Sequence, residues 1–337
     1  MTASKKSAVH FSISSLFNHF IFIYFSTSYT ADALKNNSGF IKLCQKLRKV
    51  ALNMTDVSSL VVCLKTLVFC HVAADSHIIQ TLLHLIKSRV NDLELHQIIF
   101  LNFLLKKIKC PLSDALIIAL PVVFQTQLET QLDMQNVKLM CDSLRYAIDQ
   151  RLSVNKVKFI ADNLLANSRR WETNNVCGII WSLGKVRNLS DYGLSPLLEN
   201  ALSRLAKLVY RLEKRDLERT LVVTGENYNS RSRHWYNEEV CRETAQRVVQ
   251  EQWPLSATSS VGRTFSKMSY VNFEFLDYYS ALIADSNANL TMHPHYVLAP
   301  FAVANYKPPN FDKMMAILLT YSSERTVMPV SNINYMI

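Results

Sequence analysis

The side chains best suited to chemistry in this chain are arginines that stand close to tryptophans in the sequence. Arg169 and Arg170 precede Trp171, and Arg233 stands two residues before Trp235. A site for single-stranded nucleic acid needs cations that follow the phosphates and ring faces on which the bases stack. The pattern therefore predicts a groove for single-stranded RNA.

The predicted groove draws on basic and aromatic residues between Arg145 and Trp235. Their rings are expected to be exposed, because a buried ring offers no face to a base. An alternative holds from Arg211 to Glu218, where acids and bases alternate as they do on an exposed, salt-bridged helix. The complete predicted set is Arg145, Lys156, Lys158, Arg169, Arg170, Trp171, Lys185, Arg187, Arg211, Arg215, Tyr228, Arg231, Arg233 and Trp235.

The charge balance of the chain agrees with an anionic partner. The formal net charge is +10 at pH 7 and the isoelectric point is about 9.2. Such a balance favours association with nucleic acid or with an anionic membrane surface, although it says nothing about the fold. We expect RNA as the partner and no small-molecule substrate.

No catalytic or metal-binding pattern is found in the sequence. The phosphate-binding loop, the dinucleotide fingerprint, the nucleophile elbow and the kinase loops are all missing. The seven cysteines are widely spaced and form no C-x-x-C pair, which predicts core residues in a reducing compartment. His293 and His295 stand two apart, a spacing that does not bring them to one helix face. We therefore expect no catalysis, no metal and no cofactor.

The composition predicts a helical protein. The chain has 337 residues, of which only six are glycine and nine are proline, while 49% are hydrophobic. Hairpin turns and phosphate-cradling loops need more glycine than this. An all-α fold is therefore expected.

The elements that must position the basic residues are predicted to be repeated pairs of helices. Apolar runs restart at Val61, Ile98, Val137 and Val176, at intervals of roughly 37 to 39 residues. Each run is followed by a second stretch with helical spacing of its apolar residues. These second helices are expected at Ile78–Val90, Ala115–Leu128, Val154–Leu165 and Leu194–Leu208.

Beyond Leu205 the repeat is less regular. A polar insertion at Glu226–His234 separates the two helices of a degenerate pair, Leu217–Val223 and Asn237–Gln250. Two further pairs are expected at Val261–Met268 with Phe273–Ala284 and at Val297–Asn305 with Phe311–Leu319. The whole pattern predicts a helical-pair repeat solenoid of about seven hairpins, each of roughly 38 residues.

The expected domain organisation has three parts. Residues 1–38 form a targeting or disordered segment, residues 39–320 form the repeat domain, and residues 321–337 form a polar tail. The first segment contains Lys5 and Lys6, no acidic residue before Asp32, and an apolar run at Leu16–Phe25. It fits a mitochondrial presequence, a secretory signal or a first helix, and the free cysteines favour the mitochondrion. The run is too short for stable membrane insertion.

Three segments resemble the helical-repeat region of the FAST kinase domain-containing family of mitochondrial RNA-binding proteins. They are VCGIIWSLGKVRN, VGRTFSKMSYVNFEFLDYYSALI and YVLAPFAVANYKPPNFDKMMAIL. The likeness covers roughly Leu52 to Leu319 and is strongest after Val176. The matching residues of the third segment are Leu298, Pro300, Phe301, Ala302, Asn305, Tyr306, Pro308, Pro309 and Asn310.

This resemblance implies an α-solenoid of the mitochondrial matrix that binds organellar transcripts and regulates their processing, stability or translation. Other mitochondrial RNA-processing proteins are further expected partners. Family members usually continue into a C-terminal RAP domain similar to a small nuclease, whereas this sequence stops at Ile337. We therefore expect a truncated member, a divergent member or a partial gene product, and carry over no activity of that domain.

Two other functions are kept as alternatives. The first is a protein-binding scaffold of the armadillo or HEAT type, which would expose an apolar patch of several hundred square ångströms. The second is an enzyme whose active site follows no sequence pattern, which would need a deep pocket holding carboxylates, histidine or cysteine with shifted pKa values. An RNA-binding solenoid should instead show cations and exposed rings from successive repeats on one face.

Overall fold

The computed structural model describes residues 37–229, 231–285 and 293–324, with side chains described as far as residue 320. Within these residues the chain is all-helical and has no β-strand, as the composition predicts. The helices divide into two compact units, whose boundary in the sequence lies between Leu152 and Ser153. The expected N-terminal segment and polar tail lie almost entirely outside the described residues.

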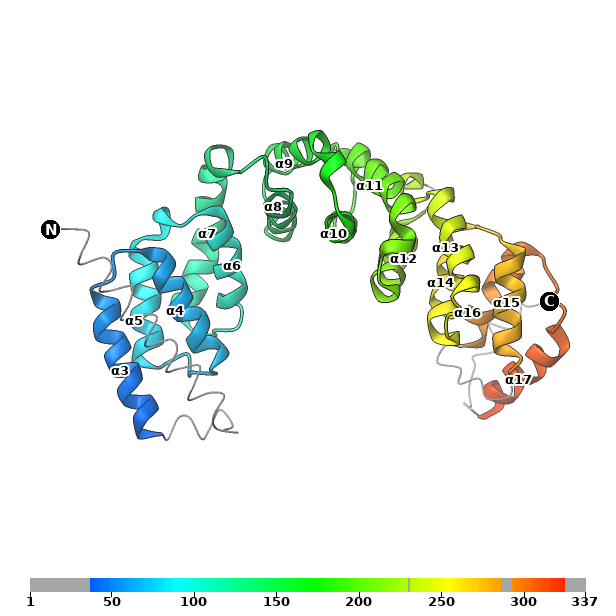
Figure 1. Ribbon diagram of the computed structural model, residues 1–337, viewed down its shortest axis with the longest axis horizontal. Coiled ribbons are helices and arrows are strands. Elements are labelled where there is room, and N and C mark those ends of the chain that lie inside the picture. Colours follow the sequence, from blue (N-terminus) through cyan, green and yellow to red (C-terminus); the bar gives the residue numbers. More distant parts are fainter. Residues whose placement is uncertain (1–36, 230, 286–292, 325–337) are drawn as a thin grey trace. The chain divides into compact units, whose positions relative to one another are not determined.

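The described part of unit 1, from residue 37 onward, contains six α-helices; their succession along the chain can be followed in Figure 1. The even-numbered helices α4, α6 and α8 pack on one another in succession, and so do the odd-numbered helices α3, α5 and α7. Leu60, Leu83 and Leu101 are fully buried in the core between these two rows. The helix bounds are α3 Ser38–Leu52, α4 Val57–Phe69, α5 His77–Ser88, α6 Leu95–Leu105, α7 Pro111–Gln131 and α8 Val137–Asp149.

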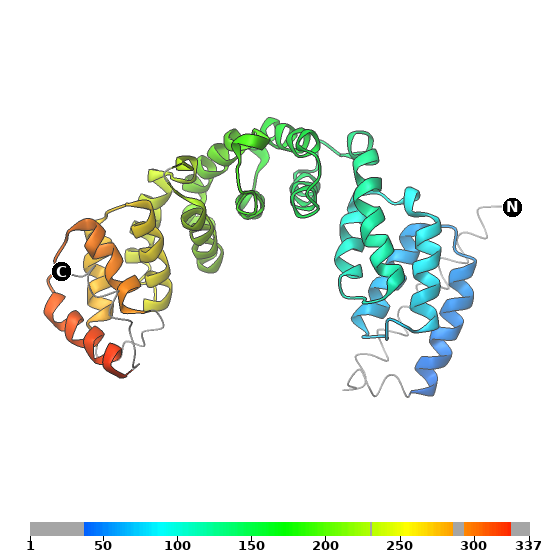
Figure 2. The ribbon, with the colours of Figure 1, turned by 180° about the vertical axis from the view of Figure 1, so that it is seen from behind.

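The described residues of unit 2 form nine α-helices that pack in two rows as well; Figure 2 shows them from the opposite side. Its even-numbered row is α10, α12, α14 and α16, and its odd-numbered row runs from α9 through α11, α13 and α15 to α17. The bounds are α9 Val154–Ala166, α10 Thr173–Leu183, α11 Ser195–Leu208, α12 Lys214–Asn227, α13 Glu238–Gln250, α14 Leu255–Met268, α15 Phe273–Ile283, α16 Pro294–Ala304 and α17 Phe311–Glu324.

Short 3-10 helices occupy several of the turns between the α-helices. They hold part of each connection in a defined backbone conformation, so that the next helix starts at a fixed place. Their bounds are η1 Val90–Asp92, η2 Ser168–Arg170, η3 Ser190–Tyr192, η4 Val209–Arg211 and η5 Arg233–Trp235.

Glycines set the spacing of the even-numbered row in unit 2. A Cβ atom built on Gly184 would lie 2.5 Å from Cγ1 of Val223 on α12. One built on Gly225 of α12 would lie 2.7 Å from Cγ2 of Thr264 on α14. Real Cβ atoms do not approach other atoms this closely, so a larger residue at either position would force the facing side chain or its helix to shift. At these two glycines, the backbone of one even-numbered helix therefore packs directly against a side chain of the next.

The helices form where the apolar periodicity predicts them, and the differences lie at their ends. The degenerate pair consists of two full helices, α12 and α13, on either side of the polar insertion. The last helix continues to Glu324, beyond the boundary expected at residue 320. Hydrogen bonding by the backbone carries a helix past its last apolar contact, which periodicity does not register.

By length and composition, α7 is the one described helix that could cross a membrane, with a mean hydropathy of 1.3 and 33% of its apolar window buried. The core helix of a soluble protein passes the same test. Here α7 packs against α5 and α6 through Leu116, Leu120 and Phe124, each at most 1% exposed.

Candidate nucleic-acid interface

The predicted basic residues lie at the surface, as an RNA contact requires. Lys156 and Tyr228 are half-buried, and two of the three predicted aromatic residues are buried. The exposed members of the set are Arg145, Lys158, Arg169, Arg170, Lys185, Arg187, Arg211, Arg215, Arg231 and Arg233.

The prediction that Trp171 stacks on a base is wrong, because this side chain is only 1% exposed. Trp171 directly precedes Glu172, the N-cap of α10, whose side chain forms a reciprocal capping box with Asn175. An apolar residue before an N-cap typically packs back onto the helix and fixes the direction from which the chain enters. The carbonyl oxygen of Trp171 also accepts a hydrogen bond from Arg204 Nη2 at 3.5 Å. Trp171 is therefore a core residue.

The prediction for Trp235 is wrong for a related reason. This residue ends η5, which packs against α11 and α12, and its side chain is 3% exposed. The polar segment before Trp235 is thus attached to unit 2 through this buried apolar side chain. Arg231 and Arg233 remain exposed next to this anchor.

The structure does not gather the predicted cations of unit 2 into one groove. Arg169 and Arg170 lie in η2, at the N-terminal end of α10. Lys185 and Arg187 follow the opposite, C-terminal end of the same helix. The cations around α12 divide in the same way, with Arg211 before its first residue and Arg231 and Arg233 after its last. The outward side of the even-numbered helices lies between these two sets.

That outward side carries an aromatic–cation pair that the sequence did not reveal. The guanidinium carbon of Arg219 on α12 lies 4.1 Å from the centre of the Trp181 ring on α10. The Trp181 indole donates a hydrogen bond to Thr220 Oγ1 at 3.0 Å, which fixes the orientation of the ring. Trp181 is half-buried and Arg219 is exposed, so the pair lies at the surface. We call the outward side of the even-numbered helices in each unit the even-helix face.

A second pair lies on the same face, between α14 and α16. Arg263 lies 4.3 Å from the ring centre of Tyr296, and the His295 ring lies 4.0 Å from that of Tyr296. Burial, together with the charges of His293 and Arg263, holds the pKa of His295 below its ordinary value. This shift favours the neutral form of His295, and Arg263 is the permanent cation beside the Tyr296 ring.

Unit 1 has an even-helix face of the same kind. Lys65 Nζ on α4 lies 5.4 Å from the ring centre of Phe100 on α6. Lys107, just after α6, lies 5.0 Å from the ring centre of Phe69 and 4.8 Å from that of Phe103. Both units thus place a cation of one helix over a ring of its even-numbered neighbour.

Most helices of this face lack acidic residues. Helices α4, α6, α10, α14 and α16 contain no aspartate or glutamate, whereas α8 contains Asp142 and Asp149 and α12 contains Asp216, Glu218 and Glu226. Among the described residues, none of Lys65, Arg219 and Arg263 is within ion-pair distance of a carboxylate. Cations held over rings and away from carboxylates keep most of their attraction for a phosphate.

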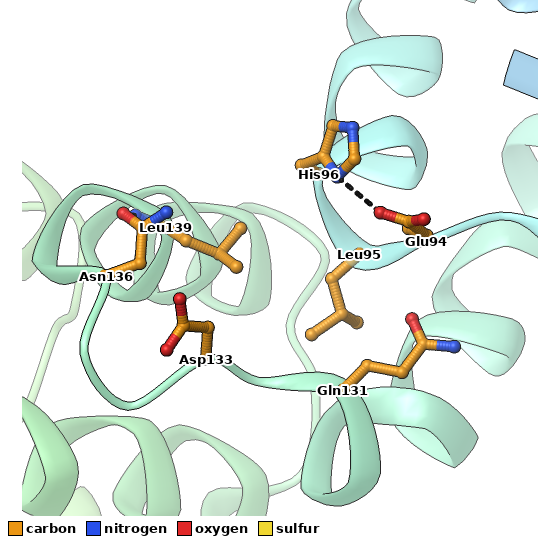
Figure 3. A pocket seen from close by; sticks show the side chains of 7 residues that line it. All are labelled: Glu94, Leu95, His96, Gln131, Asp133, Asn136 and Leu139. Atoms are coloured by element: carbon orange, nitrogen blue, oxygen red, sulfur yellow. Dashed lines mark hydrogen bonds and ion pairs between the residues drawn. The ribbon is translucent and has the colours of Figure 1, made fainter.

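A pocket of about 500 Å³ lies elsewhere in unit 1, where α6 and α8 begin and α7 ends (Figure 3). Its polar side chains include Glu94, His96 and Asp133. His96 Nδ1 lies 3.2 Å from Glu94 Oε2, and both side chains are more than half exposed, at 61% and 65%. Such an exposed pair is largely screened by water. The pair of His96 and Glu94 is therefore a solvated contact at the start of α6.

Within the part of the chain that the structure describes, no group of three or more histidine, cysteine, aspartate or glutamate side chains could hold a metal ion. No protein-family model matches the chain, and no curated protein sequence matches it.

Proposed function

We propose that this chain binds single-stranded RNA along its even-helix faces and acts without catalysing a reaction on it. The observation that carries the proposal is the recurrence of a surface cation over an aromatic ring between neighbouring even-numbered helices. It occurs at Lys65 with Phe100, at Arg219 with Trp181, and at Arg263 with Tyr296. Phosphates need the cations and bases need the rings, so the pairs offer both contacts of a single strand.

We also propose that each unit is a stretch of a helical-pair solenoid. The support comes from hydrogen bonds between residues about one repeat apart. Gln97 Nε2 donates to Ser58 Oγ over a sequence separation of 39, and Trp181 bonds to Thr220 over the same separation. Repeats that contact only their neighbours are expected to produce contacts at one constant separation.

The RNA we propose is a mitochondrial transcript, and the function we propose is the regulation of its processing, stability or translation. This part of the proposal depends on the resemblance to the FAST kinase domain-containing family and on the composition of residues 1–38. Fusion of residues 1–38 to a fluorescent protein tests the location directly. Import into the mitochondrial matrix supports it, and secretion or retention in the cytosol contradicts it.

The proposed binding is tested by titrating the purified chain into a mixed-sequence single-stranded RNA and the matching duplex, between about 50 and 200 mM salt. We expect preference for the single strand and affinity that falls as salt rises. The variant Arg219→Ala with Arg263→Ala should weaken binding and reduce the slope of log affinity against log salt by about 1.4, since each phosphate contact contributes about 0.7 for a single strand.

Arg242→Ala is the matched control for this variant. Arg242 lies on the odd-numbered helix α13, where its side chain is 51% exposed. Its removal changes the net charge without touching the even-helix face, so binding should change little. An Arg242→Ala effect as large as the effect of each even-face arginine would show that only total charge matters and would contradict the proposed site.

One observation favours the alternative of a protein-binding scaffold. On α7, Ile118 is 76% exposed and Val122 is 61% exposed, and these residues share the side of the helix away from the core. A scaffold would use such a side for a partner protein. This alternative predicts no RNA binding even at about 50 mM salt, together with a protein partner that is lost when Ile118 and Val122 are replaced by aspartate.

A further inference from the structure

We propose that the C-terminal ends of α4 and α6 form a clamp that stacks on unpaired RNA bases, formed by Phe69, Phe103 and Lys107. This inference depends on the proposed function and adds to it the residues by which unit 1 stacks on the bases. Lys107 Nζ lies within 5.0 Å of both ring centres, so one cation stands between two rings from neighbouring helices.

The rings of Phe69 and Phe103 point away from the core, although other side chains of the same helices are buried in it. On α4, Leu60, Leu64 and Leu67 are fully buried, whereas Phe69 on the same helix is 47% exposed. On α6, Phe103 is 50% exposed. Half-exposed aromatic side chains on the far side of a helix from its core contribute little to folding, and a contiguous group of them marks a binding surface.

The same surface continues along both helices. Val62 and Lys65 precede Phe69 by about two turns and one turn of α4, and Phe100 precedes Phe103 by about one turn of α6. Val62 is 48% exposed, and Lys65 lies over Phe100. Three rings and two cations thus line the contact between α4 and α6, which is long enough for more than one nucleotide.

Charge complementarity selects a polyanion as the occupant. The stretches Val57–Ala74 and Leu95–Ser113 contain Lys65, Lys106, Lys107 and Lys109 and no acidic residue. A protein helix docked here would bury these ammonium groups and would need its own carboxylates opposite each of them. A single RNA strand supplies a phosphate with every base, so it satisfies rings and cations together.

The stacking role is tested with Phe69→Ala and Phe103→Ala in the full chain, against two probes. The first probe is a mixed-sequence single-stranded RNA, and the second is inorganic polyphosphate, which has the charge without the bases. The double variant should lose about 5- to 140-fold in RNA affinity, because stacking on one base is worth about 1 to 3 kcal/mol and every 1.4 kcal/mol is tenfold. Its affinity for polyphosphate and its salt slope for RNA should match those of the wild type.

Two further variants separate stacking from charge and from general apolarity. Lys107→Ala should weaken the binding of both probes and reduce the RNA salt slope by about 0.7. Phe69→Leu with Phe103→Leu keeps apolar side chains at these half-exposed positions and should preserve folding. This leucine pair should lose RNA affinity as the alanine pair does. Tyrosine at both positions should restore it.

The outcomes distinguish this inference from the proposed function. If the wild type binds RNA and both Phe69 and Phe103 variants bind equally well, the clamp is refuted while RNA binding by the even-helix faces stands. Parallel loss of RNA and polyphosphate binding in the phenylalanine variants, or full affinity in the leucine pair, also refutes stacking. A wild-type chain that fails to bind RNA at about 50 mM salt overturns both proposals.

Discussion

Arg247 offers the sharpest test of what holds unit 2 together. Its side chain lies on α13 and only 5% of the residue is exposed. The Nη1 atom donates hydrogen bonds to the carbonyl oxygens of Val209 and Leu212, the latter at 2.8 Å, in the turn that leads from α11 to α12. Its Nε atom donates to Glu251 Oε1 at 2.9 Å. One guanidinium thus ties α13 to the turn about one repeat before it.

Replacing Arg247 by alanine leaves the two carbonyl groups without their donor inside the protein. Each buried acceptor that loses its partner costs about 1 to 3 kcal/mol. Glu251 keeps Lys214 Nζ at 3.4 Å and is a third exposed, so the loss of its own partner adds little. We expect Arg247→Ala to lower the free energy of unfolding of unit 2 by about 3 to 5 kcal/mol. Lysine carries a single nitrogen and should recover less than half of this loss.

The measurement is guanidinium denaturation followed by tryptophan fluorescence, with hydrogen exchange of the turn amides as a local readout. Trp253 lies 5.8 Å from the Arg247 guanidinium and reports on this region. Two units need not unfold together, so the exchange rates at Val209–Leu212 are compared separately. Arg242→Ala is the control, because Arg242 and Glu239 are half exposed and Glu243 is a quarter exposed, so these ion pairs are worth less than about 1 kcal/mol. An Arg247→Ala variant within about 1 kcal/mol of this control would refute the argument.

Three further predictions concern single residues. Burial acts to raise the pKa of Glu251, but hydrogen bonds from Arg247, Trp253 and Lys214 and the charge of Arg247 outweigh it and hold the pKa below its ordinary value. The ionised carboxylate therefore stabilises the fold, and this stabilisation is lost as pH falls from the ordinary pKa of a glutamate through the lower pKa of Glu251. Acid titration should destabilise the wild type relative to Glu251→Gln over this range, and parallel curves would contradict this. Gly225→Ala should cost about 1 to 3 kcal/mol of unit 2 stability in thermal melts, because the new methyl group meets Thr264; an unchanged melting temperature would show that α12 and α14 separate freely. Hydrogen bonds outweigh burial at Cys110 and leave its pKa below 9.0, so mass spectrometry should find it alkylated at pH 8 before the buried cysteines.

The helices were predictable because their signal is local. An apolar stripe at helical spacing needs no knowledge of the rest of the fold, and α9, α11 and α15 lie within one or two residues of their expected bounds. The packing of the helices on one another was harder to predict from the sequence. The close approach at Gly184 and Gly225 depends on side chains about one repeat ahead, which a local pattern does not contain.

The errors at Trp171 and Trp235 share one physical cause. A tryptophan beside arginines satisfies the composition of an RNA site, and it equally satisfies the need for an apolar anchor before a helix. The deciding signal was the repeat register. Trp171, Leu212 and Trp253 each directly precede the N-cap of an even-numbered helix, and all three are at most 5% exposed. Alignment of these positions would have assigned Trp171 to the core.

The aromatic clamp was missed for the opposite reason. Helices α4 and α6 are apolar on nearly every side, so periodicity attributes all of their large side chains to the core. Phe69 and Phe103 stand out only when their position relative to the buried leucines is known. The useful sequence signal was a lysine about one helical turn from a phenylalanine on each helix, in a stretch without acidic residues.

Close packing and the cation–ring pairs are two consequences of the same sequence choice. Small residues at the contacts of α10 with α12 and of α12 with α14 bring neighbouring even-numbered helices together. At this spacing the guanidinium carbon of Arg219 lies 4.1 Å from the centre of the Trp181 ring on the adjacent helix. Widening the spacing with Gly184→Ala should therefore loosen the pair as well as the packing. If RNA binds this face, that variant should weaken RNA affinity although Gly184 offers the RNA no side chain. An unchanged affinity in the folded variant would separate the packing from the site.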